Sequence, residues 1–127
     1  MKVPFVITAL VLAVVFFILG GVFVALPGPA ASFYGLPTDN HSAEFYVRAI
    51  GLRDMALSIY IAGLTIAGER RALSIVLLGT LIIPAGDLLL LLLGSDAARL
   101  IHYALHFVSL LCFAGLAWWN HQTLEAG

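Results

Sequence analysis

The stretch Glu44–Ser58, EFYVRAIGLRDMALS, decides the fold of this chain. It carries Arg48, Arg53 and Asp54 inside a segment that is otherwise apolar enough to cross a membrane. A charged side chain at the centre of a bilayer costs roughly 2.5–3.5 kcal/mol, so these three and Asp87 facing lipid would cost roughly 10–14 kcal/mol. That sum matches the net stability of a typical protein. We therefore expect the charges to face one another, water or a ligand, with the other helices as walls around them.

The composition is that of an integral membrane protein. Of the 127 residues, 62% are hydrophobic and 10% are charged, against usual shares of about 45–50% and about 25%. The length fits one domain, residues 1–127, and the expected partner is the lipid bilayer. Six Lys and Arg against seven Asp and Glu provide no basic patch, which excludes nucleic acid as a partner. The single cysteine, Cys112, excludes an intrachain disulfide, and no cofactor motif is visible.

The apolar runs predict an all-α fold, an antiparallel transmembrane four-helix bundle. The helices are expected at about 3–26, 44–67, 72–94 and 97–120, each near the roughly 20 residues that a bilayer span needs. The turns GERR and SD are short, which makes consecutive helices antiparallel neighbours. The Pro- and Gly-rich linker 26–43 is expected to be non-helical, at the membrane interface or over the mouth of the bundle, with Ser42 as the cap of the second helix.

Basic residues predict the orientation of the bundle. Lys2, Arg70 and Arg71 fall on one side of the membrane, and only Arg99 lies close to the other. The positive-inside rule therefore places both termini in the cytoplasm, N-in and C-in. The expected location is a bacterial inner (plasma) membrane, which the chain crosses several times.

Ionisable residues of three predicted helices lie at similar depths. At about 1.5 Å of rise per residue, all of them fall within about 15 Å of the outer ends of their helices. They form one polar layer in the outer half of the bundle, composed of Arg48, Arg53, Asp54, Asp87, His102 and His106.

The spacing within this layer predicts its contacts. Adjacent residues on a helix point about 100° apart, so Arg53 and Asp54 are expected to pair with other helices, with Asp87 as the partner of one arginine. The second helix must then be enclosed on several sides, and a homo-oligomer is one way to achieve this. Arg48 lies four residues from Glu44, a spacing that favours an ion pair. Pro84 cannot donate a hydrogen bond to the carbonyl of Thr80, which predicts a kink there.

The order of these features resembles a known family. It consists of a Pro-rich exit from the first helix with Tyr34-Gly35-Leu36-Pro37, then Arg48 and Gly51-Leu52-Arg53-Asp54, a Gly-Asp on the third helix and a His on the fourth. This order is similar to that of the DoxX-like superfamily of small membrane proteins, most of all to a branch marked by Gly-x-Arg-Asp. The resemblance implies a four-helix bundle. The functions of the superfamily vary, from a quinone-linked oxidoreductase subunit to members without known activity, and this chain lacks the cysteine pair of the thiol-redox relatives.

The leading functional hypothesis is a membrane enzyme that performs acid–base chemistry on a lipophilic small molecule, such as isomerisation, ring opening or cyclisation. Asp87 and His106 are the expected acid–base pair, because they lie at similar depths on neighbouring helices. Arg53 is the expected partner of a ligand oxygen, and Asp54 is the fourth expected catalytic residue. Further candidates for binding the substrate are Arg48, His102, Tyr46 and Tyr103.

Three alternatives stay open at this point. The same residues could hold a lipophile or quinone, or relay protons in a transport module, without catalysis. His102 and His106 lie four residues apart and could hold a metal ion with Asp87. Without further ligands this signal is weak, and no metal is predicted. The charges could also be purely structural and fix the register of the helices.

Overall fold

A computed structural model describes residues 2–38, 40–94 and 98–125 of the chain. These residues form helices and no strand. The helices are α1 (Val3–Ala25), α2 (Pro27–Tyr34), α3 (His41–Ala67), α4 (Arg70–Thr80), α5 (Ile82–Gly94) and α6 (Leu100–Glu125). Four helical stretches are long and apolar enough to cross a membrane, namely Val3–Ala25, His41–Ala67, Arg70–Gly94 and Leu100–Gln122. The prediction of an all-α fold with four such stretches is confirmed.

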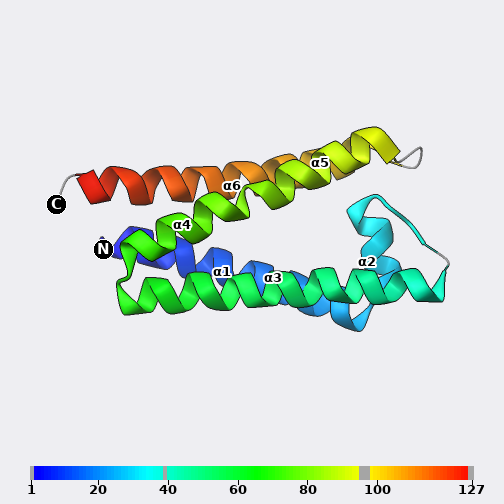
Figure 1. Ribbon diagram of the computed structural model, residues 1–127, viewed down its shortest axis with the longest axis horizontal. Helices are drawn as coiled ribbons and strands as arrows, with labels where there is room; N and C mark the ends of the chain where they lie inside the picture. The colour runs from blue at the N-terminus through cyan, green and yellow to red at the C-terminus, as the bar shows by residue number, and fades with distance from the viewer. Residues whose placement is uncertain (1, 39, 95–97, 126–127) are drawn as a thin grey trace.

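The long helices lie in two layers (Figure 1). α1 and α3 form one layer, and α6 with the continuous pair α4 and α5 forms the other. Both termini lie at one end of the molecule. The short helix α2 lies at the opposite end, where it rises from the layer of α1 and α3 toward the other layer.

The linker after α1 is partly helical, contrary to the prediction. Pro27 and Pro29 lie in the first turn of α2, where a missing N–H leaves no hydrogen bond unmade. The prolines therefore start this helix and do not prevent it. Gly35 ends it in the left-handed conformation, with φ of 103°, and donates its N–H to the carbonyls of Ala31 and Ser32.

Three other helix starts differ from the expected positions. α4 begins at Arg70 and not at 72. α3 begins at His41, three residues early, because the side chain of Asn40 accepts the N–H of Ser42 and caps the helix. Ser42 itself is therefore not the cap. α6 begins at Leu100 and not at 97, and the predicted turn at Ser95-Asp96 lies outside the described residues.

The predicted kink in the third membrane helix is confirmed. α4 ends at Thr80 and α5 begins at Ile82, with Leu81 in a turn between them. Pro84 lies four residues after Thr80 and cannot donate to its carbonyl, so the regular hydrogen-bond ladder is interrupted there. The kink lets α5 diverge from α3 after α4 has crossed toward the other layer.

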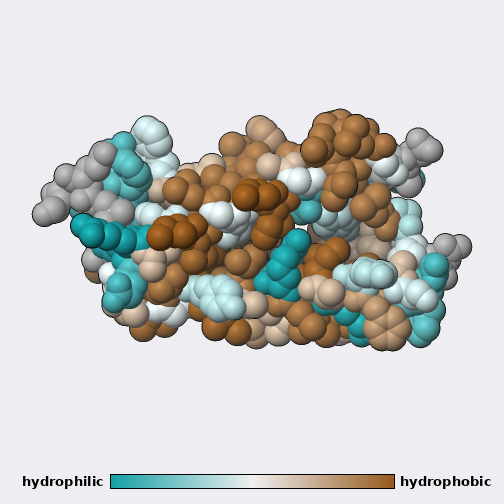
Figure 2. All heavy atoms as spheres, in the orientation of Figure 1, coloured by the Kyte–Doolittle hydropathy of each residue, from teal (hydrophilic) through white to brown (hydrophobic). Residues whose placement is uncertain are grey.

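The apolar core lies toward the end of the molecule that carries the termini. Four helices contribute to it with fully or nearly buried side chains, which are Phe5, Ala9, Ala13, Ile61, Leu73, Leu77, Phe113, Leu116 and Ala117. Figure 2 shows that hydrophobic residues cover most of the visible surface and that hydrophilic ones gather at the two ends and in one small group near the middle. A belt of this kind is expected of a protein surrounded by hydrocarbon.

α1 and α3 make a very close helix crossing through Gly20 and Gly51. A Cβ atom built on Gly51 would lie 2.5 Å from the carbonyl oxygen of Gly20, and one built on Gly20 would lie 2.6 Å from that of Gly51. Only residues without a side chain allow the two backbones to approach so closely. The Gly51 of the Gly-Leu-Arg-Asp stretch thus fixes the helix that carries Arg53 and Asp54.

Candidate functional site

A cavity of about 390 Å³ lies between the two layers, on the α2 side of the core. Its walls come from α1, α2, α3, α5 and α6, and most of them are apolar. Among the described residues, five ionisable side chains other than cysteine line it. They are Tyr34, Arg53, Asp54, Asp87 and His106. In Figure 2 a small hydrophilic group interrupts the hydrophobic face near its middle, at a hollow between the layers.

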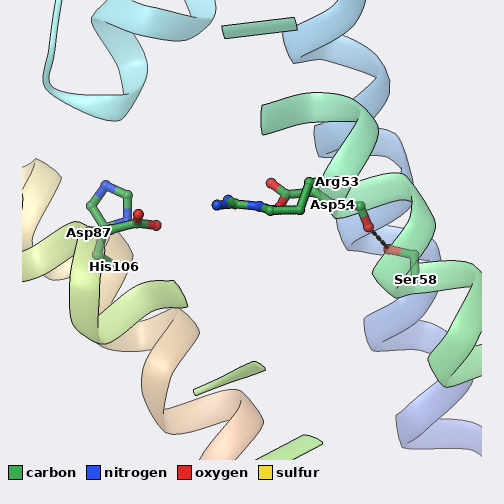
Figure 3. A network of polar contacts seen from close by, with 5 residues as sticks. All are labelled: Arg53, Asp54, Ser58, Asp87 and His106. Carbon is green, nitrogen blue, oxygen red and sulfur yellow. Dashed lines mark hydrogen bonds and ion pairs between the residues drawn. The ribbon is translucent and has the colours of Figure 1, made fainter. Parts of the chain in front are cut away.

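Asp87 on α5 and His106 on α6 face each other across the boundary between these helices. His106 Nδ1 lies 3.6 Å from Asp87 Oδ2, and the two side chains are only 12% and 13% exposed. Figure 3 shows the carboxylate directly beside the imidazole ring. The predicted proximity of these two residues is confirmed, whereas their role stays a prediction. The partner of Asp87 is thus a histidine and not the arginine that was expected.

A backbone contact fixes the tautomer of His106. Its Nε2 lies 3.1 Å from the carbonyl oxygen of Tyr34, which can only accept a hydrogen bond, so Nε2 carries a hydrogen. The other ring nitrogen, Nδ1, is the atom that faces Asp87. Without a proton between them, a lone pair would face a carboxylate. One proton on Nδ1, or on the carboxyl group of Asp87, would remove this repulsion and make the pair neutral.

Tyr34, the last residue of α2, completes this side of the cavity. Its ring packs edge-on against His106, with 4.5 Å between the ring centroids, and contacts Phe23 on α1 at 6.2 Å. Burial raises the pKa of its hydroxyl well above the usual value, and a hydrogen-bonding interaction with Asp87 raises it further. The phenol therefore stays protonated and can donate a hydrogen bond to the carboxylate or to a ligand.

Arg53 and Asp54 on α3 lie on the opposite side of the cavity. Arg53 Nε and Nη2 donate to the same oxygen, Asp54 Oδ1, at 3.1 and 3.0 Å. The expectation that the two residues pair with other helices and not with each other is wrong. The 100° between their Cα–Cβ directions does not separate them, because the long arginine side chain bends back onto its neighbour. Figure 3 shows the guanidinium directed across the gap toward Asp87 and His106.

Arg48 and Glu44 do not form the expected ion pair. Arg48 donates to the backbone carbonyl of Val24 near the end of α1. Glu44 Oε2 lies 3.4 Å from Nδ1 of His41, one turn earlier in α3. Arg48 points toward α1 because the close crossing of the two helices brings the last carbonyls of α1 within its reach. It therefore attaches α1 to α3 and does not line the cavity.

The other three candidates for binding a substrate also lie away from the cavity walls. His102 Nδ1 accepts the N–H of Arg99 at the start of α6. The Tyr103 hydroxyl donates to the carbonyl of Leu91, which attaches α6 to α5. Tyr46 is 76% exposed on the outside of α3. Spacing along a helix did not reveal these positions, because it fixes which residues share a face but not which neighbour that face meets.

The metal alternative gains no support from this geometry. No group of three or more His, Cys, Asp or Glu side chains within residues 2–38, 40–94 and 98–125 is arranged to hold a metal ion. His102 is occupied by the backbone of Arg99 and is not beside His106 and Asp87 as a third ligand.

Tyr34 is the main site residue that is absent from the candidates expected from the sequence. From the sequence, Tyr34-Gly35-Leu36-Pro37 is interpreted as part of a linker at the membrane interface or over the mouth of the bundle and as part of the family resemblance, without a role in the site. Gly35 shows why the segment penetrates the bundle: a Cβ atom on it would lie 3.0 Å from His102 and from Leu91. A glycine directly after an aromatic residue at a helix end was the available signal, since glycine permits both the turn and the close docking.

A comparison with protein families gives one result. Residues 13–120 match the family described as a domain of unknown function, DUF4267. The chain belongs to this DUF4267 family. The matched range includes all five ionisable residues at the cavity. Comparisons with functionally curated proteins and with solved structures give no match.

Proposed function

We propose that this DUF4267 protein is a multi-pass membrane enzyme that performs acid–base chemistry on a lipophilic small molecule. Isomerisation, ring opening and cyclisation are the reaction types that its residues could serve. The observation that carries the proposal is the Asp87–His106 pair on the wall of an apolar cavity. Ionisable residues in the membrane are costly, so a paired set around a cavity is best explained by function.

In the proposed reaction, the Asp87–His106 pair gives its shared proton to one atom of the substrate and takes a proton back from another. The Tyr34 carbonyl holds the imidazole in place, which keeps Nδ1 directed at the carboxylate. Arg53, which reaches into the cavity from the opposite side, binds the oxygen on which negative charge develops. The apolar walls exclude water, which strengthens each of these interactions.

Deuterium exchange into simple ketones tests the proposal and does not require the natural substrate. Purified protein in vesicles would be incubated in D2O with lipophilic ketones of about 10–15 carbons, which suit a cavity of this size. We expect deuterium to appear next to the carbonyl, and Asp87→Asn and His106→Gln to slow this exchange roughly a hundredfold or more while thermal stability is kept. His41→Gln, at the exposed start of α3, is the matched control. Folded variants with undiminished exchange would rule out the assignment.

A second candidate function is binding or transport of a lipophile or quinone without chemistry. The cavity favours it by its mainly apolar walls, which suffice to hold such a molecule. Under this alternative the wild-type protein would retain lipid or quinone during purification but would catalyse no exchange. Mass spectrometry of extracts from wild-type protein and from Asp87→Asn separates the two functions.

The proposed setting is a bacterial inner membrane, with an antiparallel four-helix bundle whose termini face the cytoplasm. The positive-inside rule and the common end of the two termini support this orientation. In a Cys112→Ala background, a cysteine at Glu69 should react with an impermeant thiol reagent only from the inside, and one at Asn40 only from the outside. The opposite labelling would reverse the orientation and move the cavity to the cytoplasmic half.

Two further expectations belong with this proposal. The order of sequence features supports a distant relationship to the DoxX-like superfamily.

The side chain of Arg53 is 39% exposed, which supports a homo-oligomer in which a second copy encloses that side of α3.

A further inference from the structure

The charged groups around the cavity are arranged in two pairs. Arg53 carries a positive charge and Asp54 a negative one, and the two are joined by two hydrogen bonds. Asp87 and His106 also face each other as a pair, 3.6 Å apart, and one proton on either the nitrogen or the oxygen makes this pair neutral. Tyr34 remains protonated because burial raises its pKa. The other polar groups on the walls, Ser109 and Cys112, add no formal charge.

A charged ligand would have to break one of these pairs. A carboxylate or phosphate would need the guanidinium of Arg53 and would leave Asp54 unpaired in an apolar region. An amine would need Asp54 or Asp87 and would leave Arg53 or His106 without its partner. Uncompensated charges among apolar, partly buried walls are unfavourable, whereas a neutral ligand requires no such exchange.

Hydrogen bonds to a neutral oxygen remain available. Two nitrogens of Arg53 are used by Asp54, but the guanidinium presents five donors in total. The single hydrogen of the Tyr34 hydroxyl, on the other side of the cavity, interacts with Asp87, so Arg53 provides the donors that are available to a ligand. The polar groups lie on α2, α3, α5 and α6, while the cavity side of α1 contributes apolar side chains, which are Leu12, Val15, Phe16, Leu19 and Phe23.

We infer that the ligand of this cavity is an uncharged lipophile with a carbonyl or hydroxyl oxygen at one end, and not a fatty acid, a phosphate ester or an amine. This inference rests on the proposed function in that it takes the cavity as the ligand site. The oxygen lies between Arg53 and the Asp87–His106 pair, and the hydrocarbon part lies along α1. The volume of about 390 Å³ is within the range of small-molecule pockets.

Three photoreactive probes with the same diazirine-bearing dodecyl chain test the inference. One ends in a methyl ketone, one in a carboxylate and one in an amine. Each is added to vesicles that contain the full-length protein, and crosslinked residues are identified by mass spectrometry of the cavity-lining part of α6. In wild-type protein we expect the ketone to label this segment at least about tenfold more than either charged probe.

Charge variants then distinguish binding in the cavity from partition of the probe into the vesicle. Partition is the same for all variants, whereas binding depends on the charges of the cavity. Asp54→Asn leaves Arg53 unpaired and should raise labelling by the carboxylate about tenfold relative to wild type. Glu69→Gln removes the same charge outside the cavity and should leave the labelling unchanged. The double variant Arg53→Gln/Asp54→Asn removes both charges and should keep the wild-type order of labelling by the three probes. It replaces the single variant as the test if the single variant does not fold.

Two outcomes would overturn the inference. One is labelling of the wild-type cavity by a charged probe as strongly as by the ketone, and the other is absence of ketone labelling from the cavity. The result is distinguishable from a failure of the proposed enzyme. A preference for the ketone without deuterium exchange would support the inferred ligand class and reject the proposed chemistry. Deuterium exchange together with a preference for the carboxylate would support the chemistry and reject the ligand class.

Discussion

At the end of the molecule that carries the termini, side chains from four helices close into a core, whereas toward α2 the same layers enclose a cavity. The first region contains small and large apolar residues together, such as Ala9 and Ala13 of α1 with Phe5 and Phe113. The second contains Arg53, Asp54, Asp87 and His106 among apolar walls. Apolar side chains can fill any gap of matching volume, but charged ones must be placed at specific partners.

The two regions depend on different features of the backbone. The core needs only that the helices approach one another, which small residues permit. The cavity needs α5 to diverge after the kink at Leu81 and needs α2 to dock between the layers. The Gly20–Gly51 crossing connects the regions, because it holds α1 and α3 together close to the charged residues of α3. The cavity is therefore produced by specific features of the backbone and is not the result of poor packing at one end of the molecule.

The largest effect is expected at the helix crossing. A Cβ atom on Gly51 would overlap the carbonyl of Gly20 at 2.5 Å, and backbone atoms cannot move aside as a side chain can. Gly51→Val should therefore separate α1 from α3 and prevent accumulation of folded protein. Gly63→Val, on the same helix with nothing within 4 Å, is the matched control. Detergent extraction followed by size-exclusion chromatography measures both, and a folded, monodisperse Gly51→Val variant would contradict the described crossing.

A pair of leucine truncations compares the two regions directly. Leu77 is fully buried in the core, so Leu77→Ala leaves an empty space and should cost about 2–5 kcal/mol. Leu105 already lines the cavity, so Leu105→Ala only enlarges an existing space and should cost about 1 kcal/mol or less. Unfolding in mixed micelles gives both values. Equal costs would mean that the cavity is filled in the same way as the core.

Much of this architecture follows from the sequence alone. The apolar runs and the break before Pro84 were predictable because helix length and the missing N–H are local properties. The approach of Asp87 to His106 was predictable from depth, since packed helices bring equal depths together. The pairing of Arg53 with Asp54 was not, because the reach of a flexible side chain is not set by the direction of its Cβ atom. The docking of α2 also depends on contacts far along the chain, notably the one between Tyr34 and His106.

The smallest effect is expected at Tyr34. There, the loss of folding stability at alkaline pH shows whether water is excluded from the cavity. The pKa of this hydroxyl is raised in the folded protein from its usual value of about 10, first by burial and then by Asp87. Above about pH 10 the unfolded chain loses a proton that the folded protein keeps. This contribution to stability is therefore complete below about pH 10 and decreases as the pH rises further.

Tyr34→Phe removes the hydroxyl but keeps the carbonyl that accepts from His106. The variant should therefore lose less stability than wild type on alkaline titration, by about 1 kcal/mol near pH 11. Tyr60→Phe, at an exposed position of α3, is the control and should follow the wild-type curve. Parallel curves for wild type and Tyr34→Phe would mean that the Tyr34 hydroxyl is hydrated. Water would then fill the space between α2 and α5, and the cavity would be an aqueous pocket without a dry site for a lipophile.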